Sequence, residues 1–210
     1  MSLDGVMQAP GGPEEDPTGG FAHGGWVAPY WDETAGGSMA PLFAEPFDLL
    51  LGRRTYEIFA AYWPYNDDHP IGRAFNEAAK YVVTSSTEPL SWSNSHAIND
   101  GADGVARLKE SVGPNLVIQG SSGLYPDLLA RGLIDRLSLL TFPVLLGKGK
   151  RLFGQNGPSG ALKLVESQVS TTGVIIARYE PAGPVRTGTF ETKEPSEAEL
   201  ARRAKMRRDG

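Results

Sequence analysis

The sequence predicts an α/β fold in which a mostly parallel sheet is extended on one side by antiparallel strands. Two observations support this. Up to about residue 136, short apolar runs alternate with helical stretches, which is typical of parallel strands joined by helical crossovers. Beyond that point two strand-like runs, 162–168 and 173–179, follow each other directly and predict an antiparallel hairpin.

Each predicted element has a local signal. Strands are predicted where β-branched and large apolar residues run together, at 47–51, 81–84, 116–119 and 137–146. Helices are predicted where the apolar spacing is helical and a glycine or proline ends the pattern, at 38–45, 55–62, 105–111 and 125–131, and residues 75–80 are predicted to end a further helical piece. Residues 1–37 contain several Gly-Gly pairs and are predicted to form a long loop.

The composition excludes several classes of function. The chain has no cysteine, which excludes thiolate catalysis, disulfides and cysteine zinc sites. Its formal charge of −5 argues against a nucleic-acid partner, and no apolar run approaches the ~20 residues that span a bilayer. The three histidines are scattered, so no metal site is predicted. We therefore expect a cytoplasmic protein that acts on a small molecule and binds neither nucleic acid nor membrane.

A change of character near residue 181 predicts two parts, a folded domain over 1–182 and a polar tail over 183–210. In the tail, Ser196-Glu197-Ala198-Glu199 matches a capping box that opens a helix, and basic residues crowd the end of that helix. Two interpretations remain open: a solvated helix and a basic docking tail.

Three predicted strand ends carry residues suited to binding anions. Arginine offers phosphate a fixed fork of donors, and a glycine-rich turn before a helix offers unpaired backbone N–H groups. Carboxyl ends of parallel strands share one edge, where ligands of open α/β sheets bind. We therefore expect these segments to hold one extended, multiply phosphorylated ligand, although singly each could be a turn, a surface charge or a cap. The residues are Gly52, Arg53, Arg54 and Thr55; Thr84, Ser85 and Ser86; and Gln119, Gly120, Ser121, Ser122, Gly123 and Leu124.

Other familiar motifs do not match. No G-x-G-x-x-G fingerprint follows any predicted strand. The run at 147–150 is not a P-loop, because no serine or threonine follows its lysine. The turn at 120–123 is one residue too short for a G-x-S-x-G nucleophile elbow, which argues against a serine hydrolase.

Four segments, in this order, resemble the dihydrofolate reductase-like superfamily: Ser2-Leu3-Asp4-Gly5, Gly52-Arg53-Arg54-Thr55-Tyr56, Val83-Thr84-Ser85-Ser86 and Ile118-Gln119-Gly120-Ser121-Ser122-Gly123-Leu124. The chain is most similar to the C-terminal reductase domain of the bifunctional riboflavin-biosynthesis deaminase/reductase and its stand-alone relatives. The resemblance implies a three-layer fold with helices on both faces of a mixed sheet. It also implies an NADPH-dependent reductase that transfers a hydride to a C=N or C=O of a small heteroaromatic substrate.

The resemblance also implies roles for single residues. Arg53 and Ser85-Ser86 would hold the adenosine 2′-phosphate of NADPH, Arg54-Thr55 would reach the pyrophosphate, and residues 120–124 would cradle the pyrophosphate and nicotinamide side. A 2′-phosphate calls for arginine, whereas NAD would call for a carboxylate at the ribose.

Asp4 is the candidate proton donor. We expect Trp26, Tyr30 and Trp31 to form a substrate pocket around it, and burial among these rings would raise its pKa. The alternatives are a turn-forming aspartate before a glycine and an aromatic loop that simply packs on its own core.

Two departures from the family bear on the substrate and on the chain start. The riboflavin reductases usually place a basic residue after the Ser-Leu-Asp-Gly motif, to bind the substrate phosphate, but Val6 stands here. Two hypotheses for the activity therefore remain. The first is reduction of 5-amino-6-(5-phosphoribosylamino)uracil, as in riboflavin biosynthesis, and the second is a dihydrofolate reductase-like reaction on a flat apolar substrate. The family also has a strand before this motif, so we expect the natural start to lie upstream of Met1.

Function hypotheses from other classes stay open. The chain could be an NADPH-binding or sensing protein with little catalysis, or a structural module whose glycines serve only turns. Relatives are commonly dimers, so a homodimer is among the expectations.

Overall fold

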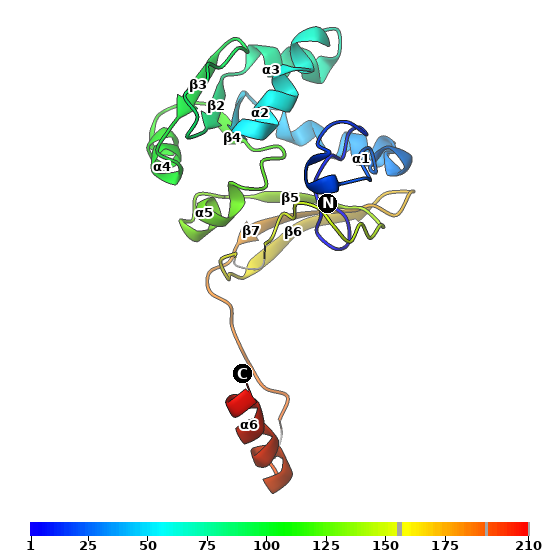
Figure 1. The fold of residues 1–210 in the computed structure, drawn as a ribbon, viewed down its shortest axis with the longest axis vertical. Helices are drawn as coiled ribbons and strands as arrows, with labels where there is room; N and C mark the ends of the chain where they lie inside the picture. Colours follow the sequence, from blue (N-terminus) through cyan, green and yellow to red (C-terminus); the bar gives the residue numbers. More distant parts are fainter. Residues whose placement is uncertain (155–156, 192, 210) are drawn as a thin grey trace.

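The computed structural model describes residues 1–154, 157–191 and 193–209 and shows two sheets surrounded by helices (Figure 1). The first sheet is parallel, with strand order β3-β2-β1-β4, and the second is antiparallel, with order β5-β7-β6. The strands are β1 Phe47–Gly52, β2 Lys80–Val83, β3 Ser95–Ile98, β4 Asn115–Val117, β5 Leu137–Thr141, β6 Leu162–Val169 and β7 Ile175–Pro181. The helices are α1 Glu33–Gly37, α2 Arg53–Ala60, α3 Pro70–Glu77, α4 Ala102–Glu110, α5 Tyr125–Ala130 and α6 Glu197–Asp209.

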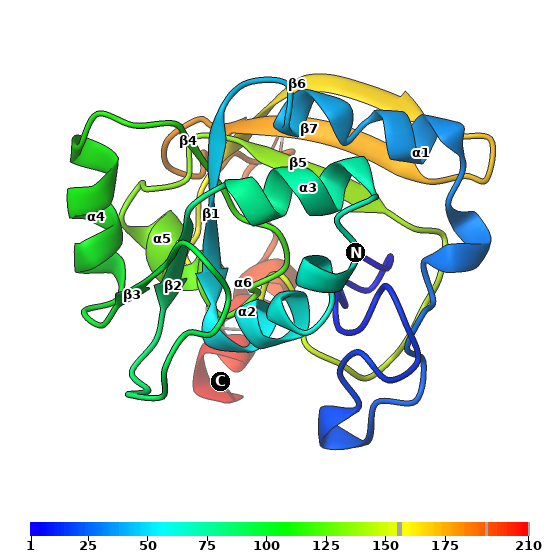
Figure 2. The same cartoon turned by 90° about the horizontal axis from the view of Figure 1, so that it is seen from above.

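Helices cover both faces of the parallel sheet, as predicted (Figure 2). Alternation along β1 explains this, because successive side chains of a strand point to opposite faces. Leu49 and Leu51 pack with Tyr56 of α2 and Phe75 of α3, whereas Leu50 packs in the cluster formed with α4 and α5. All three leucines are buried. The layers are therefore helix, sheet and helix, and the predicted fold class is confirmed.

A third apolar cluster joins the N-terminal loop to the antiparallel sheet. Phe21 and Trp26 of the loop pack with Phe142 and Ile176. Met1 lies beside β5, where its amino group donates to the carbonyl of Leu140 at 2.5 Å. Among the described residues no strand joins β4 to β5, so the predicted mixed sheet is divided in two.

Several predicted elements are shifted or absent. The helix expected at 38–45 is wrong: α1 ends at Gly37, after Asp32 caps it by accepting the N–H of Ala35 at 2.8 Å, and only a short 3₁₀ turn follows. The strand expected at 137–146, with an interruption at Pro143, ends at Thr141 and does not resume as a regular strand after the proline. β3 was not predicted, because four residues that are exposed or half-buried give no apolar signal.

The C-terminal helix forms where the capping box predicts it. The Ser196 hydroxyl accepts the N–H of Glu199 at 3.3 Å, but the Glu199 carboxylate binds Arg202 and Arg203 instead of reaching back. Helix α6 stands away from both sheets at the end of an extended segment (Figure 1), and none of its described side chains is buried. Within the described residues, no helix is both long and apolar enough to cross a membrane.

A buried lysine stabilises the segment that follows β2. Lys80 is fully buried, donates to the carbonyl of Asn76 at 2.8 Å and lies 4.4 Å from the centre of the Trp92 ring. The indole N–H of Trp92 in turn donates to the Asn76 side chain, and Tyr56 accepts the backbone N–H of Trp92. Burial lowers the pKa of Lys80 to about 8, while the nearby charge of Asp48 acts in the opposite direction.

We predict that wild-type stability rises relative to a Lys80→Met variant as pH increases from about 8 to 10.5. In this window the unfolded chain holds a proton on Lys80 that the folded chain has released, so raising the pH favours folding. Below pH 8 the difference in unfolding free energy between the wild type and the variant should not change with pH. Urea unfolding at several pH values measures this difference, with exposed Lys205→Met as the control. A flat difference across the whole range would contradict the prediction.

Candidate cofactor site

The three predicted segments lie at neighbouring strand ends. β1 pairs in parallel with both β2 and β4, so Gly52, Thr84 and the turn after β4 occupy the same edge of the sheet. Helix α2 begins at Arg53, directly after the last residue of β1. The side chains at 53–55 are therefore placed by the first turn of a helix that packs on the sheet.

Two hydrogen bonds tie the end of β1 to the turn at 120–123. The N–H of Gly52 donates to the Ser121 hydroxyl at 3.0 Å, and the N–H of Ser121 donates to the Thr55 hydroxyl at 3.0 Å. Gly120 and Ser121 both have positive φ, of 68° and 56°. A Cβ at Gly120 would lie 3.1 Å from the Thr55 methyl group. The positive φ and this close contact both favour glycine at position 120. The hydroxyls of Thr55 and Ser121 thus hold the turn in place.

The next residues of the turn offer donors. Among the described residues, the N–H groups of Ser122 and Gly123 meet no acceptor, and the space around the Cα of Gly123 is open. A small cavity of about 40 Å³ adjoins them and is lined by Val83, Gly101 and Leu124, among others. The side-chain oxygen of Gln119 is buried without a partner in the described part of the chain. Free N–H groups beside a helix start suit an anion.

Arg53 crosses the turn that follows β2. Its guanidinium donates to the Glu57 carboxylate at 2.6 Å and to the Glu88 carbonyl at 2.8 Å, and the side chain is largely buried. The hydroxyls of Thr84 and Ser86 accept backbone N–H groups of that turn, whereas Ser85 is exposed. The structure thus brings Arg53 and the hydroxyl-rich turn together, as the sequence predicts.

Arg54 reaches the N-terminal loop instead. Its guanidinium donates to the Thr18 hydroxyl at 2.8 Å and lies 3.6 Å from the buried carboxylate of Asp16. Lys150 binds the same carboxylate and also donates to Thr18 at 3.0 Å. Although burial raises the pKa of Asp16, the hydrogen bonds from Lys150 and Thr18 outweigh it and the pKa is lowered. Sequence reasoning missed this cluster, because one aspartate in a Gly- and Pro-rich loop gives no distinctive signal.

The expected environment of Asp4 is wrong. Its carboxylate accepts the Ser2 hydroxyl at 2.6 Å and the backbone N–H groups of Leu146 and Gly147, and Arg151 lies 3.3 Å away. The bond from Ser2 is the largest of the effects that lower the pKa of Asp4 to about 2, whereas burial among aromatic rings was expected to raise it. Asp4 is therefore ionised near neutral pH and serves to hold the loop at 146–151.

The aromatic residues of the N-terminal loop divide between core and surface. Trp26 is buried, donates its indole N–H to the carbonyl of Gln8 at 2.9 Å and meets Phe142 edge-on. Tyr30 packs against the same cluster, whereas Trp31 is half exposed. The loop thus packs on its own core through Trp26, and a substrate pocket formed by these rings stays a prediction.

A larger groove lies outside the predicted residues. It has a volume of about 450 Å³, opens between β3 and α4, and is lined by Tyr81, His96 and Arg107, among others. Its described lining residues include no glycine-rich turn, and their one arginine, Arg107, is paired with Asp100. We therefore place the candidate site at the strand ends and not in the larger groove.

Comparison with known proteins assigns the family. The profile of the RibD C-terminal domain family matches residues 1–176. The chain belongs to this family. Curated relatives include YyaP of Bacillus subtilis, 27% identical over 136 residues, or 62% of this chain and 72% of YyaP. YwjB of the same organism is 35% identical over 111 residues, or 50% of this chain and 57% of YwjB. Both are uncharacterised.

Solved structures show the same fold. A protein described as a riboflavin biosynthesis protein from Shewanella sp. PV-4 matches with a TM-score of 0.59 at 20% identity, covering 87% of this chain and 95% of that one. Enterococcus faecalis dihydrofolate reductase, in complex with NADP(H), matches with a TM-score of 0.55 at 14% identity, covering 86% and 92%. The fold of this RibD C-terminal domain is therefore dihydrofolate reductase-like, and family and fold together support a reductase-type oxidoreductase.

We expect an Asp4→Asn variant to be less stable than the wild type at pH 7, with a difference that disappears in acid. Because the folded pKa is lowered from 3.8 to about 2, ionised Asp4 stabilises the fold above pH 4, and this contribution is lost as pH falls through that window. Thermal unfolding between pH 2 and 7 measures it, with exposed Asp135→Asn as the control. If the two proteins still differ in thermal stability by the same amount at pH 2, the ionised carboxylate does not have this role.

Proposed function

We propose that this chain is an NADPH-dependent reductase that binds the cofactor along the edge formed by Gly52–Thr55, Thr84–Ser86 and Gln119–Leu124. The observation that carries the proposal is the position of Arg53, which lies across the hydroxyl-rich turn after β2. Arg53 donates to the Glu88 carbonyl of this turn, and a guanidinium on the turn that carries Thr84, Ser85 and Ser86 suits a phosphate monoester such as the 2′-phosphate of NADPH. The RibD family assignment and the fold support the same class of reaction.

The residues of the site fit this cofactor. The N–H groups of Ser122 and Gly123 suit the pyrophosphate, and Arg54 would contribute a second positive charge after leaving Thr18. The buried, unpartnered oxygen of Gln119 can accept an N–H from a bound ligand. When bound, NADPH would supply the hydride. The chain's own task is to orient the nicotinamide and to exclude water.

For the substrate we propose a small heteroaromatic compound with a reducible C=N or C=O. Two structural neighbours carry names of this kind: the Shewanella protein is tied to riboflavin biosynthesis, and a Corynebacterium diphtheriae protein is called pyrimidine reductase-like, with a TM-score of 0.54 and 16% identity. In this chain Val6 is fully buried, so position 6 cannot bind a substrate phosphate. The half-exposed ring of Trp31 suits a flat substrate better.

A binding or sensing role is the second candidate, and the state of Asp4 favours it. A carboxyl with a pKa of about 2 is a poor proton donor near pH 7, so the one predicted acid is not available. NADPH oxidation by this chain with a panel of pteridines and pyrimidines would distinguish the two. Saturable NADPH binding without turnover on any member would favour the sensor.

We predict that Arg53→Ala weakens NADPH binding about 10- to 100-fold and NADH binding much less. A charged hydrogen bond of ~1.5–3 kcal/mol to the 2′-phosphate is lost only with NADPH. Fluorescence titration with both nucleotides measures it, and the exposed Arg136→Ala is the matched control. Equal losses for the two nucleotides would mean that Arg53 does not bind the 2′-phosphate.

Glu57→Gln should strengthen NADPH binding by about two- to threefold, because the carboxylate of Glu57 competes with a phosphate for Arg53. The gain should shrink in 0.5 M salt, since Glu57 is exposed and the interaction is screened. The same titration tests it, with Glu110→Gln as the control. Unchanged or weaker binding at low salt would contradict the competition.

A further inference from the structure

Helix α2 holds the irregular segment after β2 at two points. The Arg53 guanidinium donates to the carbonyl of Glu88 at 2.8 Å. One turn further along the helix, the Tyr56 hydroxyl accepts the backbone N–H of Trp92 at 2.8 Å. Arg53 and Tyr56 are three residues apart, so they are neighbours on one surface of the helix. The segment that carries the proposed 2′-phosphate site is therefore bound to α2 once at the surface and once in the core.

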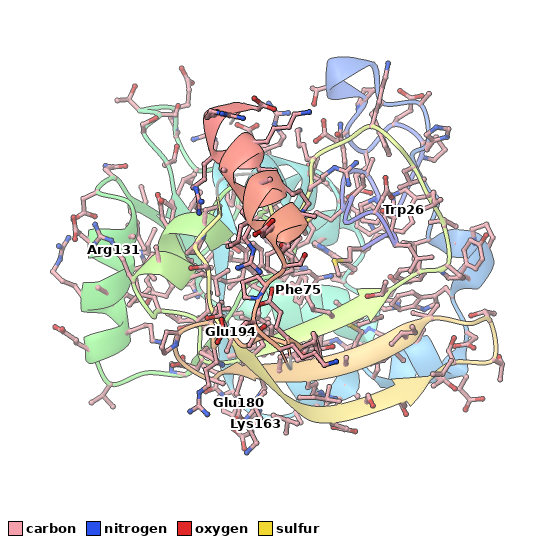
Figure 3. The ribbon with its side chains drawn as sticks, turned by 90° about the horizontal axis from the view of Figure 1, so that it is seen from below. Trp26, Phe75, Arg131, Lys163, Glu180 and Glu194 are labelled. Carbon is pink, nitrogen blue, oxygen red and sulfur yellow. The ribbon has the colours of Figure 1, made fainter. Side chains whose placement is uncertain are left out.

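The inner of these two contacts is buried. Trp92 is the only buried residue between Ser85 and Asn94, and Tyr56 is 2% exposed. Both rings belong to the apolar cluster around Phe75, which lies in the interior of the folded body (Figure 3). A backbone N–H buried there needs an acceptor, since leaving it unpaired is costly. The hydroxyl of Tyr56 supplies that acceptor.

A second set of contacts fixes the indole of Trp92. Its N–H donates to the side-chain oxygen of Asn76 at 2.8 Å, and the Asn76 amide donates to the carbonyl of Trp63 at 3.1 Å. The ammonium of Lys80 lies 4.4 Å from the centre of the ring. The backbone of Trp92 is thus held by α2 and its side chain by the end of α3, so two helices set its position.

The outer part of the segment is held mainly by short local bonds. The hydroxyl of Thr84 accepts the N–H of Ser86 at 3.0 Å, and the hydroxyl of Ser86 accepts that of Glu88 at 3.1 Å. Among the described residues, Arg53 is the one side chain from another element that donates to this outer part. The spacing between Arg53 and the hydroxyls therefore depends on where Trp92 anchors the far end.

We infer that Tyr56 is a positioning residue that sets the preference for NADPH over NADH, because it holds Trp92 and with it the far end of the segment. The inference rests on the proposed function, in which the 2′-phosphate lies between Arg53 and the hydroxyls at 84–86. Tyr56 is too deeply buried to touch a phosphate itself. It acts through the spacing of Arg53 and those hydroxyls, since a phosphate is bound by several donors only when they are held in place.

Tyr56→Phe tests the inference, because phenylalanine keeps the ring in the core and removes only the acceptor. Fluorescence titration should show the Kd for NADPH raised about three- to tenfold and the Kd for NADH changed less than about twofold. Tyr179→Phe, on β7, is the matched control. Equal changes for the two nucleotides, or none, would overturn the inference, since a residue needed only for stability does not distinguish them.

Trp92→Phe is a second variant that keeps the test open should Tyr56→Phe not fold. It retains the backbone N–H and an aromatic ring but loses the bond to Asn76. It should shift the ratio of the two Kd values in the same direction, and an unchanged ratio would again count against the inference.

Combination with Arg53→Ala separates this inference from the proposed function. If Tyr56 acts through Arg53, adding Tyr56→Phe to Arg53→Ala should change the Kd for NADPH by less than about twofold. A further three- to tenfold loss, about the effect expected of Tyr56→Phe alone, would overturn the inference and leave the role of Arg53 intact. A wild type that binds NADPH and NADH equally would overturn the proposed function, and this inference with it.

Discussion

The two hydrogen bonds that join Gly52 to Ser121 and Ser121 to Thr55 are the contacts on which the candidate site depends. They fix the turn after β4 against the start of α2, although those segments are far apart in the chain. Holding Ser121 at φ 56° costs free energy, since residues other than glycine rarely adopt that conformation. The surrounding bonds offset this strain. What results is a turn whose next two N–H groups, those of Ser122 and Gly123, meet no acceptor among the described residues.

The N-terminal loop is bound to this site by carboxylates. Asp4 holds the backbone of the loop at 146–151, and Asp16 binds Lys150 of the same loop while lying close to Arg54 of α2. Hydrogen bonds keep both carboxyls ionised, which is why their pKa values are lowered. The N-terminal loop, which would border the substrate, is thus held by negatively charged carboxylates. A phosphorylated ligand is also negatively charged. An anionic ligand that reaches Arg54 must compete with Thr18 and Asp16.

Local patterns in the sequence were enough to predict the framework. An apolar run that ends at a glycine or at small polar residues predicts β1 and β2. The same pattern, ending at Gly120, predicts the turn at 120–123. Parallel pairing then brings Arg53 to Thr84 without further information. The surroundings of Asp4 could not be predicted, because all of its partners except Ser2 lie more than 140 positions away in a loop with no regular structure. The sequence left two alternatives open for Trp26 for the same reason: its partner Phe142 lies far along the chain, just after β5.

Amide hydrogen exchange with and without NADPH tests the central claim most directly, because it reports each segment separately. The proposed site predicts slower exchange at 52–55, 84–86 and 120–124, with the largest change at Ser122 and Gly123, and no change along α6. Saturating NADPH without protection of these three segments would contradict the proposed site. So would protection confined to the groove between β3 and α4.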